Sequence, residues 1–191
     1  MRSKNQAGAR GIERSTLYVV ATPIGNLGDI TARALEVLGG VNLIAAEDTR
    51  RTGALLNYFD LNTRLLSLHE NNEIRRCPSL IARLKKGEAI ALVSDAGTPL
   101  ISDPGYRLVR AVREAGFEVR AIPGASAITA ALSICGLSSH RFAFEGFLPS
   151  RVAARQSLLA ELVHEKRTLV FFESPRRLVA TLADMRKIFG D

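Results

Sequence analysis

The sequence of 191 residues contains no tryptophan, three tyrosines and only two cysteines. With so few of these aromatic side chains, a stacking platform for single-stranded nucleic acid is poorly supported. Cys77 and Cys135 stand far apart without the spacing of metal ligands, so we expect no metal site and a reducing, cytoplasmic location. No apolar run approaches the roughly 18 residues that a membrane span requires, so we expect no membrane partner.

The motifs that would mark three common enzyme classes are also missing. The glycines of residues 22–31 are not followed by lysine, so the spacing of a phosphate-binding P-loop is absent. No expected strand ends in G-x-G-x-x-G, which argues against a nucleotide-binding dehydrogenase. No G-x-S-x-G elbow occurs, so a hydrolase triad is unsupported. A phosphate-free, nucleotide-like ligand held by backbone groups is a better match to these lysine-poor loops.

Positive charge is present in excess, with a formal net charge of +7. Because the basic residues are spread along the chain, this charge favours a broad basic face that contacts the phosphates of nucleic acid. The hydrophobic content of 47% is enough for a packed core. Residues 1–16 contain four basic residues but no hydrophobic stretch, so we expect a flexible basic tail there and no secretory signal.

Short apolar segments alternate with helical patterns over most of the chain. The expected strands are residues 17–21, 41–46, 64–68, 89–93 and 117–122. Helices are expected to follow from about residues 31, 50, 74, 106 and 126. This alternation predicts an α/β fold with a parallel, doubly wound sheet. Because polar loops follow the strands, they should gather at one edge of that sheet and form one shared site.

The pattern changes after Gly136. Only two further strands are expected, at residues 141–147 and 168–172, and Ser150 is the expected cap of the helix between them. A sheet of two strands is rarely stable alone. We therefore expect residues 17–136 to form an N-terminal α/β domain and residues 137–191 to begin a second, incomplete α/β domain.

Residues 92–105 form the most distinctive stretch of the sequence. An apolar strand ends there in a loop with two glycines, two prolines and two aspartates. Glycine lets a backbone approach a ligand closely, and proline fixes the path of the chain. In an α/β sheet such a loop is a ligand-binding position, although an ordered turn before the next helix is the alternative. We expect Asp103 to brace this loop, while Asp95 either contacts the ligand or braces the loop too.

Polar residues follow the second and third expected strands as well. Glu47 and Asp48 either cap the next helix or contact a hydroxylated substrate, with Arg50 on a phosphate. His69 is a candidate general base because histidine titrates near neutrality, and Asn71 lies beside it in the same loop. A solvated loop is the alternative for both residues.

Two further segments place possible ligand contacts at helix starts. Residues 123–127 are small, and the free N–H groups at a helix start can meet a ligand there, although tight packing explains the same residues. Arg176 and Arg177 stand at the start of the last helix, where they either bind phosphates or form a solvated basic turn.

Taken together, six segments resemble the tetrapyrrole-methylase-like, or class III, S-adenosylmethionine-dependent methyltransferases. These segments are residues 21–31, 47–50, 92–105, 122–126, 144–149 and 171–177. Each is weak alone, but six in the family's order and spacing are highly specific. The resemblance runs from about residue 17 to the end, and it is greatest to the branch of the family that methylates small-subunit ribosomal RNA.

The resemblance implies two α/β domains, with S-adenosyl-L-methionine in the cleft between them, and a homodimer. It also implies methyl transfer to the ribose 2′-hydroxyl of a cytidine in the 16S rRNA of the small ribosomal subunit, near the decoding centre. The residues expected to bind the cofactor are Pro23, Asp95, Ala96, Gly97, Thr98, Ile101, Ser126, Ala127 and Ser174. Those expected to contact RNA are Arg50, Asn71, Arg176 and Arg177.

The implied chemistry is an in-line displacement on a sulfonium methyl, for which the protein supplies orientation and a dry site. A ribose hydroxyl benefits from a base, and the candidates are Glu47, Asp48 and His69. The alternatives are a methylase of the same fold that acts on a tetrapyrrole or a protein, and a non-catalytic RNA- or ribosome-binding module. The family's second domain continues past residue 191, so we expect this chain to bind the methyl donor weakly or not at all, and tight binding in calorimetry would contradict this.

Overall fold

A computed structural model describes residues 11–190 of the chain. The chain divides into two units, Met1–Ser126 and Ala127–Asp191, which are described separately. Residues 1–10 of the expected basic tail lie outside the described residues. Ile12 packs against the core and Thr16 begins the first strand, so this end of the expected tail belongs to the first folded unit. Within residues 11–190, no helix has both the length and the apolar character needed to cross a membrane.

The first unit is built on a five-stranded sheet in the order β3-β2-β4-β1-β5. All its neighbouring strands are parallel, which confirms the predicted sheet. The strands are β1 (Thr16–Val20), β2 (Leu43–Ala46), β3 (Leu65–Ser67), β4 (Ile90–Val93) and β5 (Glu118–Ile122). Every residue of β2 and β4 is buried, as expected where helices cover both faces of a parallel sheet.

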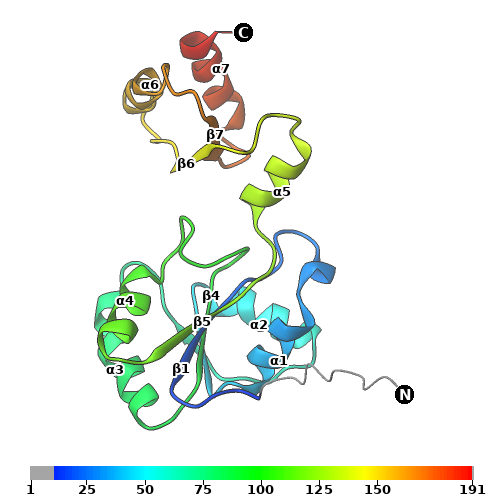
Figure 1. Cartoon of the computed structure of the whole chain (residues 1–191), viewed down its shortest axis with the longest axis vertical. Helices are drawn as coiled ribbons and strands as arrows, with labels where there is room; N and C mark the ends of the chain where they lie inside the picture. Colours follow the sequence, from blue (N-terminus) through cyan, green and yellow to red (C-terminus); the bar gives the residue numbers. More distant parts are fainter. Residues whose placement is uncertain (1–10, 191) are drawn as a thin grey trace. The chain divides into compact units, whose positions relative to one another are not determined.

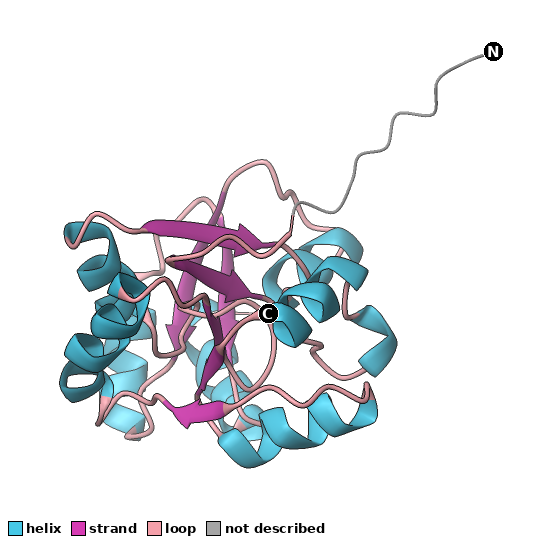
Figure 2. Ribbon diagram, turned by 90° about the horizontal axis from the view of Figure 1, so that it is seen from below, coloured by secondary structure: helices cyan, strands magenta, loops and turns pink. Residues whose placement is uncertain are grey.

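Helices form a layer on each face of this sheet. Figure 1 shows α1 and α2 on one side and α3 and α4 on the other, and Figure 2 shows the strands between the two layers. The helices are η1 (Leu27–Asp29), α1 (Ala32–Gly40), α2 (Thr49–Tyr58), α3 (Glu73–Lys85) and α4 (Tyr106–Glu114). Leu38 and Leu56 pack with one core cluster, whereas Leu80 and Leu108 pack with the other. The sheet is therefore held rigidly, with its carboxyl edge free to carry loops.

The second unit contains a parallel pair of strands and three helices. Its elements are α5 (Ala127–Ile134), β6 (Phe142–Phe147), α6 (Val152–Glu161), β7 (Thr168–Phe172) and α7 (Leu178–Phe189). The structure groups α5 with this unit, whereas the expected boundary at residue 136 placed that helix in the first domain. Ser150 was expected to cap α6, but the cap position belongs to Arg151, which makes no side-chain capping bond.

A buried ion pair ties the two longer helices of the second unit together. Arg155 on α6 is 3% exposed and donates from Nε to Oδ2 of Asp184 on α7 at 2.7 Å. Gln156 donates to the other oxygen of the same carboxylate at 2.7 Å. Because both carboxylate oxygens have partners, Asp184 is tolerated in a largely buried position.

The loop after β4 departs from ordinary backbone geometry. Leu100 and Ser102 have φ values of 73° and 63°, a region that non-glycine residues seldom adopt. Gly105, the residue before α4, has φ of 125°. Such conformations cost free energy and cluster at functional sites, so the loop is held in its shape by the structure around it.

Gly105→Ala is expected to lower the free energy of unfolding by about 1–2 kcal/mol, because the backbone there is unfavourable for any other residue. An added Cβ would also lie 2.7 Å from Cδ2 of Leu92 and 3.1 Å from Cδ1 of Leu100. Chemical denaturation measures the change. Gly11→Ala is the control, because no atom lies within 4 Å of its added Cβ. Equal midpoints for the two variants would contradict the prediction.

Candidate active site

The loops that follow β1 and β4 are joined to each other at the carboxyl edge of the sheet. The Thr22 N–H donates to the Gly97 carbonyl at 2.9 Å, and the Gly97 N–H donates back to the Thr22 carbonyl at 3.0 Å. The Thr22 hydroxyl also donates to the carbonyl of Ser94 at 3.3 Å. Gly97 has φ of 80°, so glycine suits this close approach of two backbones. The two glycine-containing loops singled out in the sequence therefore form one surface.

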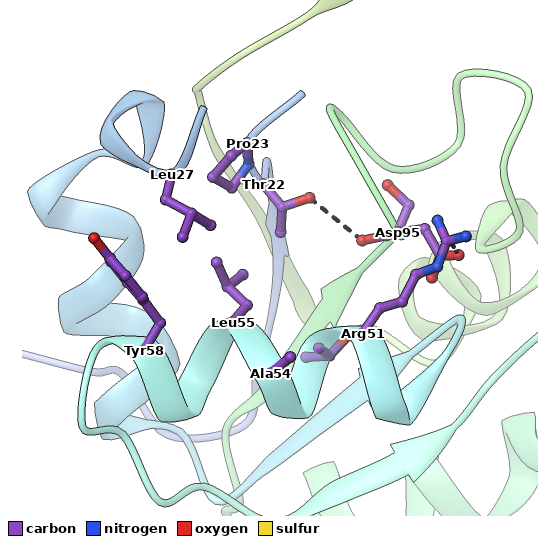
Figure 3. A pocket seen from close by; sticks show the side chains of 10 residues that line it. Thr22, Pro23, Leu27, Arg51, Ala54, Leu55, Tyr58 and Asp95 are labelled. Atoms are coloured by element: carbon purple, nitrogen blue, oxygen red, sulfur yellow. Dashed lines mark hydrogen bonds and ion pairs between the residues drawn. The ribbon is translucent and has the colours of Figure 1, made fainter. Parts of the chain in front are cut away.

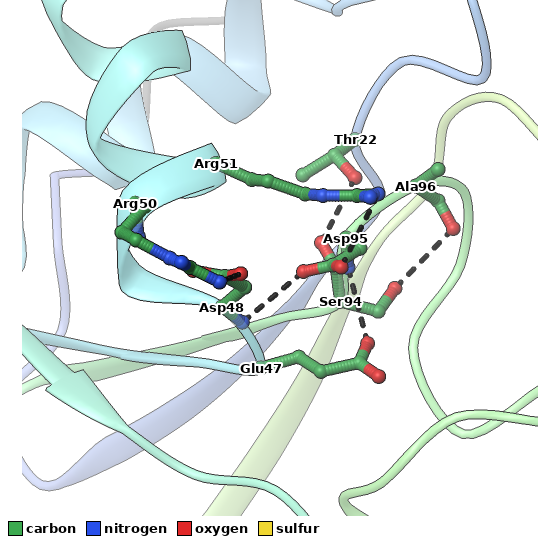
Figure 4. Close-up of polar contacts among 8 residues, drawn as sticks. All are labelled: Thr22, Glu47, Asp48, Arg50, Arg51, Ser94, Asp95 and Ala96. Atoms are coloured by element: carbon green, nitrogen blue, oxygen red, sulfur yellow. Dashed lines mark hydrogen bonds and ion pairs between the residues drawn. The ribbon is translucent and has the colours of Figure 1, made fainter.

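Asp95 connects this surface to the loop after β2 (Figure 4). Its Oδ1 accepts the N–H of Asp48 at 3.1 Å, and its Oδ2 lies 3.4 Å from Nη1 of Arg51. Its own N–H donates to Oε2 of Glu47 at 3.2 Å. Both carboxylate oxygens of Asp95 thus have protein partners, which supports a bracing role for this side chain.

Asp48 is engaged by its neighbour on α2. Its Oδ1 accepts the N–H of Arg50 at 2.8 Å and so caps the helix, as one of the two sequence interpretations held. Nε and Nη2 of Arg50 donate to the same carboxylate at 3.1 and 2.6 Å. These hydrogen bonds from Arg50 lower the pKa of Asp48, which makes it a weak base. A phosphate would have to compete with Asp48 for the guanidinium of Arg50.

Glu47 and Asp103 are carboxyl groups whose pKa values are raised, in contrast to that of Asp48. Burial raises the pKa of Glu47, and the charges of Asp103 and Asp95 raise it further, against the hydrogen bond from the Asp95 N–H. Burial likewise raises the pKa of Asp103, against a hydrogen bond from the Ser94 side chain. A carboxyl group with a raised pKa is a stronger base once it is ionised. Within residues 11–190, no cluster of three or more acidic, histidine or cysteine side chains could hold a metal ion.

Asp103→Asn is expected to stabilise the protein above pH 7, because an ionised, half-buried carboxylate is replaced by a neutral amide. A raised pKa means that the folded state binds this proton more tightly than the unfolded chain does. The stability that Asp103 contributes is therefore complete below the ordinary carboxyl pKa of about 4 and is lost as the pH rises through the folded pKa. Thermal unfolding between pH 4 and 8 measures this.

The gain in thermal midpoint over the parent protein should be present at pH 8 and absent at pH 4. Asp29→Asn removes an exposed carboxylate and is the control for a change of charge alone. A gain of the same size at both pH values, or an equal gain in the control, would contradict the prediction.

A cavity of about 350 Å³ opens beside these loops (Figure 3). Its polar side is formed by Thr22, Ser94, Asp95 and Arg51, and its apolar side by Pro23, Leu27, Ala54, Leu55 and Tyr58. A cavity with an apolar body and a few convergent polar groups is typical of a small-molecule site. Sequence reasoning named Pro23 and Asp95 but missed the contribution of α2. The spacing of residues 51, 54, 55 and 58 places them on one helix face, and this pattern could have revealed them.

The other residues expected to bind the cofactor lie along the same loop and just beyond it. The Ala96 carbonyl accepts the Ser94 hydroxyl at 3.4 Å, and the Thr98 hydroxyl donates to the Ala125 carbonyl at 3.3 Å. The side chain of Ile101 is 38% exposed. Ser126 is the last residue of the first unit, and Ala127 begins α5 of the second.

His69 and Asn71 lie in the turn after β3, an edge strand of the sheet. The His69 N–H donates to Oδ1 of Asn72 at 3.0 Å, and Nδ2 of Asn72 donates to the Ser67 carbonyl at 3.3 Å. Asn72 is 7% exposed, whereas Asn71 is fully at the surface. Asn72 therefore holds the turn, and among residues 11–190 no hydrogen bond joins the His69 side chain to the loops around Asp95.

In the second unit, Glu173 organises the turn that precedes α7. Its carboxylate accepts Nε and Nη2 of Arg177 at 2.8 and 2.7 Å, and the N–H of Ser174 at 2.7 Å. The hydrogen bond from Arg177 is the main reason why the pKa of Glu173 is lowered to about 2. Arg177 also donates to the Leu148 carbonyl at 2.7 Å, whereas Arg176 is exposed. Arg177 thus stabilises the turn, and Arg176 is the more accessible of the pair.

A parallel sheet with helices on both faces, and with joined loops and a cavity at its carboxyl edge, is a doubly wound α/β fold, a class in which ligands bind at this edge. Residues 16–191 match the family of Tetrapyrrole (Corrin/Porphyrin) Methylases. The chain belongs to this family, which confirms the resemblance of its loops.

Curated relatives are similar over nearly the whole chain. A protein of Escherichia coli O157:H7 is 55% identical over 92% of this chain and 61% of its own length. One of Xylella fastidiosa is 55% identical over 92% and 64%, and one of Micromonospora olivasterospora is 49% identical over 100% and 59%. All three are named ribosomal RNA small subunit methyltransferase I. The chain thus spans about six-tenths of the length of these relatives.

Solved structures with the same fold are more distant in sequence. Uroporphyrin-III-C-methyltransferase from Thermus thermophilus matches with a TM-score of 0.61 and 22% identity, over 91% of this chain and 72% of that one. A precorrin-6Y methylase from Archaeoglobus fulgidus matches with a TM-score of 0.56 and 22% identity, over 88% and 78%. These likenesses establish the fold.

Proposed function

We propose that the protein transfers a methyl group from S-adenosyl-L-methionine to the ribose 2′-hydroxyl of a cytidine in 16S rRNA, near the decoding centre. The observation that carries this proposal is the 55% identity, over 92% of the chain, to relatives named ribosomal RNA small subunit methyltransferase I. The excess of positive charge supports a polyanionic substrate. The proposal includes a homodimer in the cytoplasm.

The first unit offers a surface that fits the methyl donor. S-adenosyl-L-methionine, when bound, supplies an electrophilic methyl group on a positively charged sulfonium. Three acidic side chains, Glu47, Asp95 and Asp103, lie near each other and interact through their charges. Arg51 offsets part of this charge through its pair with Asp95, and the remaining negative charge favours a cationic ligand. Gly97 has no side chain to keep a ligand from the backbone. We propose that the loop from Asp95 to Ile101 and Pro23 bind the donor, with Ser126, Ala127 and Ser174 as further contacts.

We assign the role of general base to Glu47. Burial and neighbouring carboxylates raise its pKa, whereas the hydrogen bonds from Arg50 lower that of Asp48. A base works best when its pKa lies near the working pH, so Glu47 is favoured over Asp48. His69, in the turn after β3, is the alternative candidate for the base. Glu47 would take the proton of the ribose hydroxyl as the new bond from oxygen to methyl forms.

The RNA contacts are proposed to come from both units. Arg176 is exposed, and Arg50 lies at the start of α2 with its side chain 89% exposed. Arginine binds phosphate through paired donors, so Arg176 can bind a backbone phosphate directly, whereas a phosphate at Arg50 would displace the carboxylate of Asp48. Asn71 is exposed in the turn after β3 and can donate to RNA. Arg177, whose guanidinium is paired with Glu173, contributes by fixing the turn that carries Arg176.

A substrate panel tests the proposed function. The full-length protein and donor labelled in the methyl group are incubated separately with small ribosomal subunits, a tetrapyrrole and a ribosomal protein mixture. We expect label to enter the small subunit and to remain with RNA after protease treatment. Label in the tetrapyrrole or in protein would favour a methylase of the same fold with another substrate, and binding of subunits without transfer would favour a non-catalytic module.

A further inference from the structure

The second unit has a cavity of its own, of about 340 Å³. It lies where the chain enters β6 and β7, at their amino ends. Its lining comes from two short segments, residues 138–141 and 164–168. The side chains that carry or can donate a proton to an anion are Ser138, His140, Arg141, His164, Lys166 and Arg167. We call this the β6–β7 basic pocket.

The pairing of β6 with β7 brings the two segments together. Phe142 is the register partner of Thr168, so Arg141 and Arg167 precede paired positions on adjacent parallel strands. The Thr168 N–H donates to the Arg141 carbonyl at 3.2 Å, and its hydroxyl donates to the Ser138 carbonyl at 2.5 Å. The basic residues are therefore held at the pocket by hydrogen bonds of the backbone.

The charges at the pocket do not cancel. Glu165 is the acidic residue of the lining, and Nε and Nη2 of Arg167 donate to its carboxylate at 2.9 and 2.7 Å. Glu145 on β6 also acts on Arg167 through its charge. Arg141 and Lys166 form no ion pair within the described part of the chain, and both are exposed. Arg141 and Lys166 thus present positive charges without an ion-pair partner, beside two imidazole rings.

We propose that the β6–β7 basic pocket binds a phosphate group of an RNA backbone, with Arg141 and Lys166 as its main contacts. Guanidinium and ammonium groups are the usual phosphate ligands of proteins, and imidazole N–H groups supply further donors. The Ser138 hydroxyl lies 2.5 Å from Nδ1 of His140, so these two groups are paired with each other and orient the His140 ring at the pocket. The open, exposed position of the cations suits a polymer better than an isolated anion, because a polyanion releases counterions when it binds. That the polymer is RNA rests on the proposed function.

The experiment removes both charges and measures RNA binding against salt. The double variant Arg141→Gln with Lys166→Gln is compared with Lys85→Gln with Lys86→Gln, which removes two exposed cations at the end of α3. Fluorescence anisotropy with labelled single-stranded RNA is recorded at about 50–200 mM salt. We expect the pocket variant to lower the slope of log affinity against log salt by about 1.4, and affinity at physiological salt by about tenfold. The control should change both far less.

Two further arms identify the ligand. The ring C–H signals of His140 and His164 should move in NMR spectra on addition of RNA, and inorganic phosphate should move them only weakly. Equal loss of affinity in the two double variants would overturn the proposal. So would a pocket that responds to inorganic phosphate but not to RNA, or to polyglutamate as strongly as to RNA. If methyl transfer fails but the Arg141/Lys166 double variant loses RNA affinity as expected, the proposed function is overturned. The β6–β7 basic pocket would then still be an RNA-binding site.

Discussion

Glu47→Gln is expected to lower the rate of methyl transfer by about 10²–10⁴-fold, the usual contribution of a general base. The amide keeps the size of the side chain and can still accept the Asp95 N–H that Glu47 accepts at 3.2 Å. It cannot take a proton from a ribose hydroxyl. Initial rates with labelled donor and small ribosomal subunits measure the effect, and donor affinity should stay within a few fold.

The pH profile separates this role from a structural one. In the parent protein the rate should rise with pH as Glu47 ionises, at a pH above the ordinary range of a carboxyl group because its pKa is raised. The Glu47→Gln variant should lose that rise. Asp48→Asn is the matched comparison, and its loss should stay below about tenfold because Asp48 is already a weak base beside Arg50. A normal rate and profile in Glu47→Gln would remove Glu47 as the base.

Glu73→Ala is expected to lower the free energy of unfolding by about 3 kcal/mol, because it leaves a buried backbone donor without a partner. Glu73 on α3 is 4% exposed, and its Oε1 accepts the N–H of Leu108 at 2.8 Å. Leu108 lies in the first turn of α4, whose N-cap, Gly105, offers no side-chain acceptor. The carboxylate of Glu73 therefore caps α4 from a neighbouring helix and fixes the end of the loop that starts at Asp95.

The matched control for this prediction is Glu73→Gln, which retains an acceptor oxygen of nearly the same shape. It should lose less than about half of the free energy that the alanine variant loses. Urea denaturation of the two variants and the parent gives the comparison. If alanine and glutamine cost the same, the hydrogen bond to Leu108 is not what stabilises this region.

The parallel sheet and the position of the site could be predicted from local patterns. Apolar runs such as residues 89–93 and the glycine-containing loops after them determine both the strands and the edge where the loops meet. Observed strand ends differ from the expected ones by up to two residues, as for β2, which begins at Leu43 instead of residue 41.

The features that escaped prediction depend on side-chain direction, on local backbone geometry or on contacts between distant residues. Whether the Asp48 carboxylate is available as a base depends on where the Arg50 side chain points, and the spacing of the two residues does not determine that direction. The raised pKa of Glu47 comes from burial and from Asp103, more than fifty residues away in the sequence. His140 and His164 gave no signal in the sequence because only the β6–β7 register brings them to one pocket. The positive φ angles of Leu100 and Ser102 likewise have no marker in their residue types.

The central proposal is that this protein methylates a cytidine ribose in the small-subunit rRNA. Its most direct test is nucleoside mass spectrometry of 16S rRNA from unmodified small subunits after incubation with the full-length protein and S-adenosyl-L-methionine. We predict one new methyl group, on the ribose of a cytidine near the decoding centre, and its absence with Glu47→Gln. A methyl group on a base, on a nucleoside other than cytidine, or on no nucleoside at all would contradict the account.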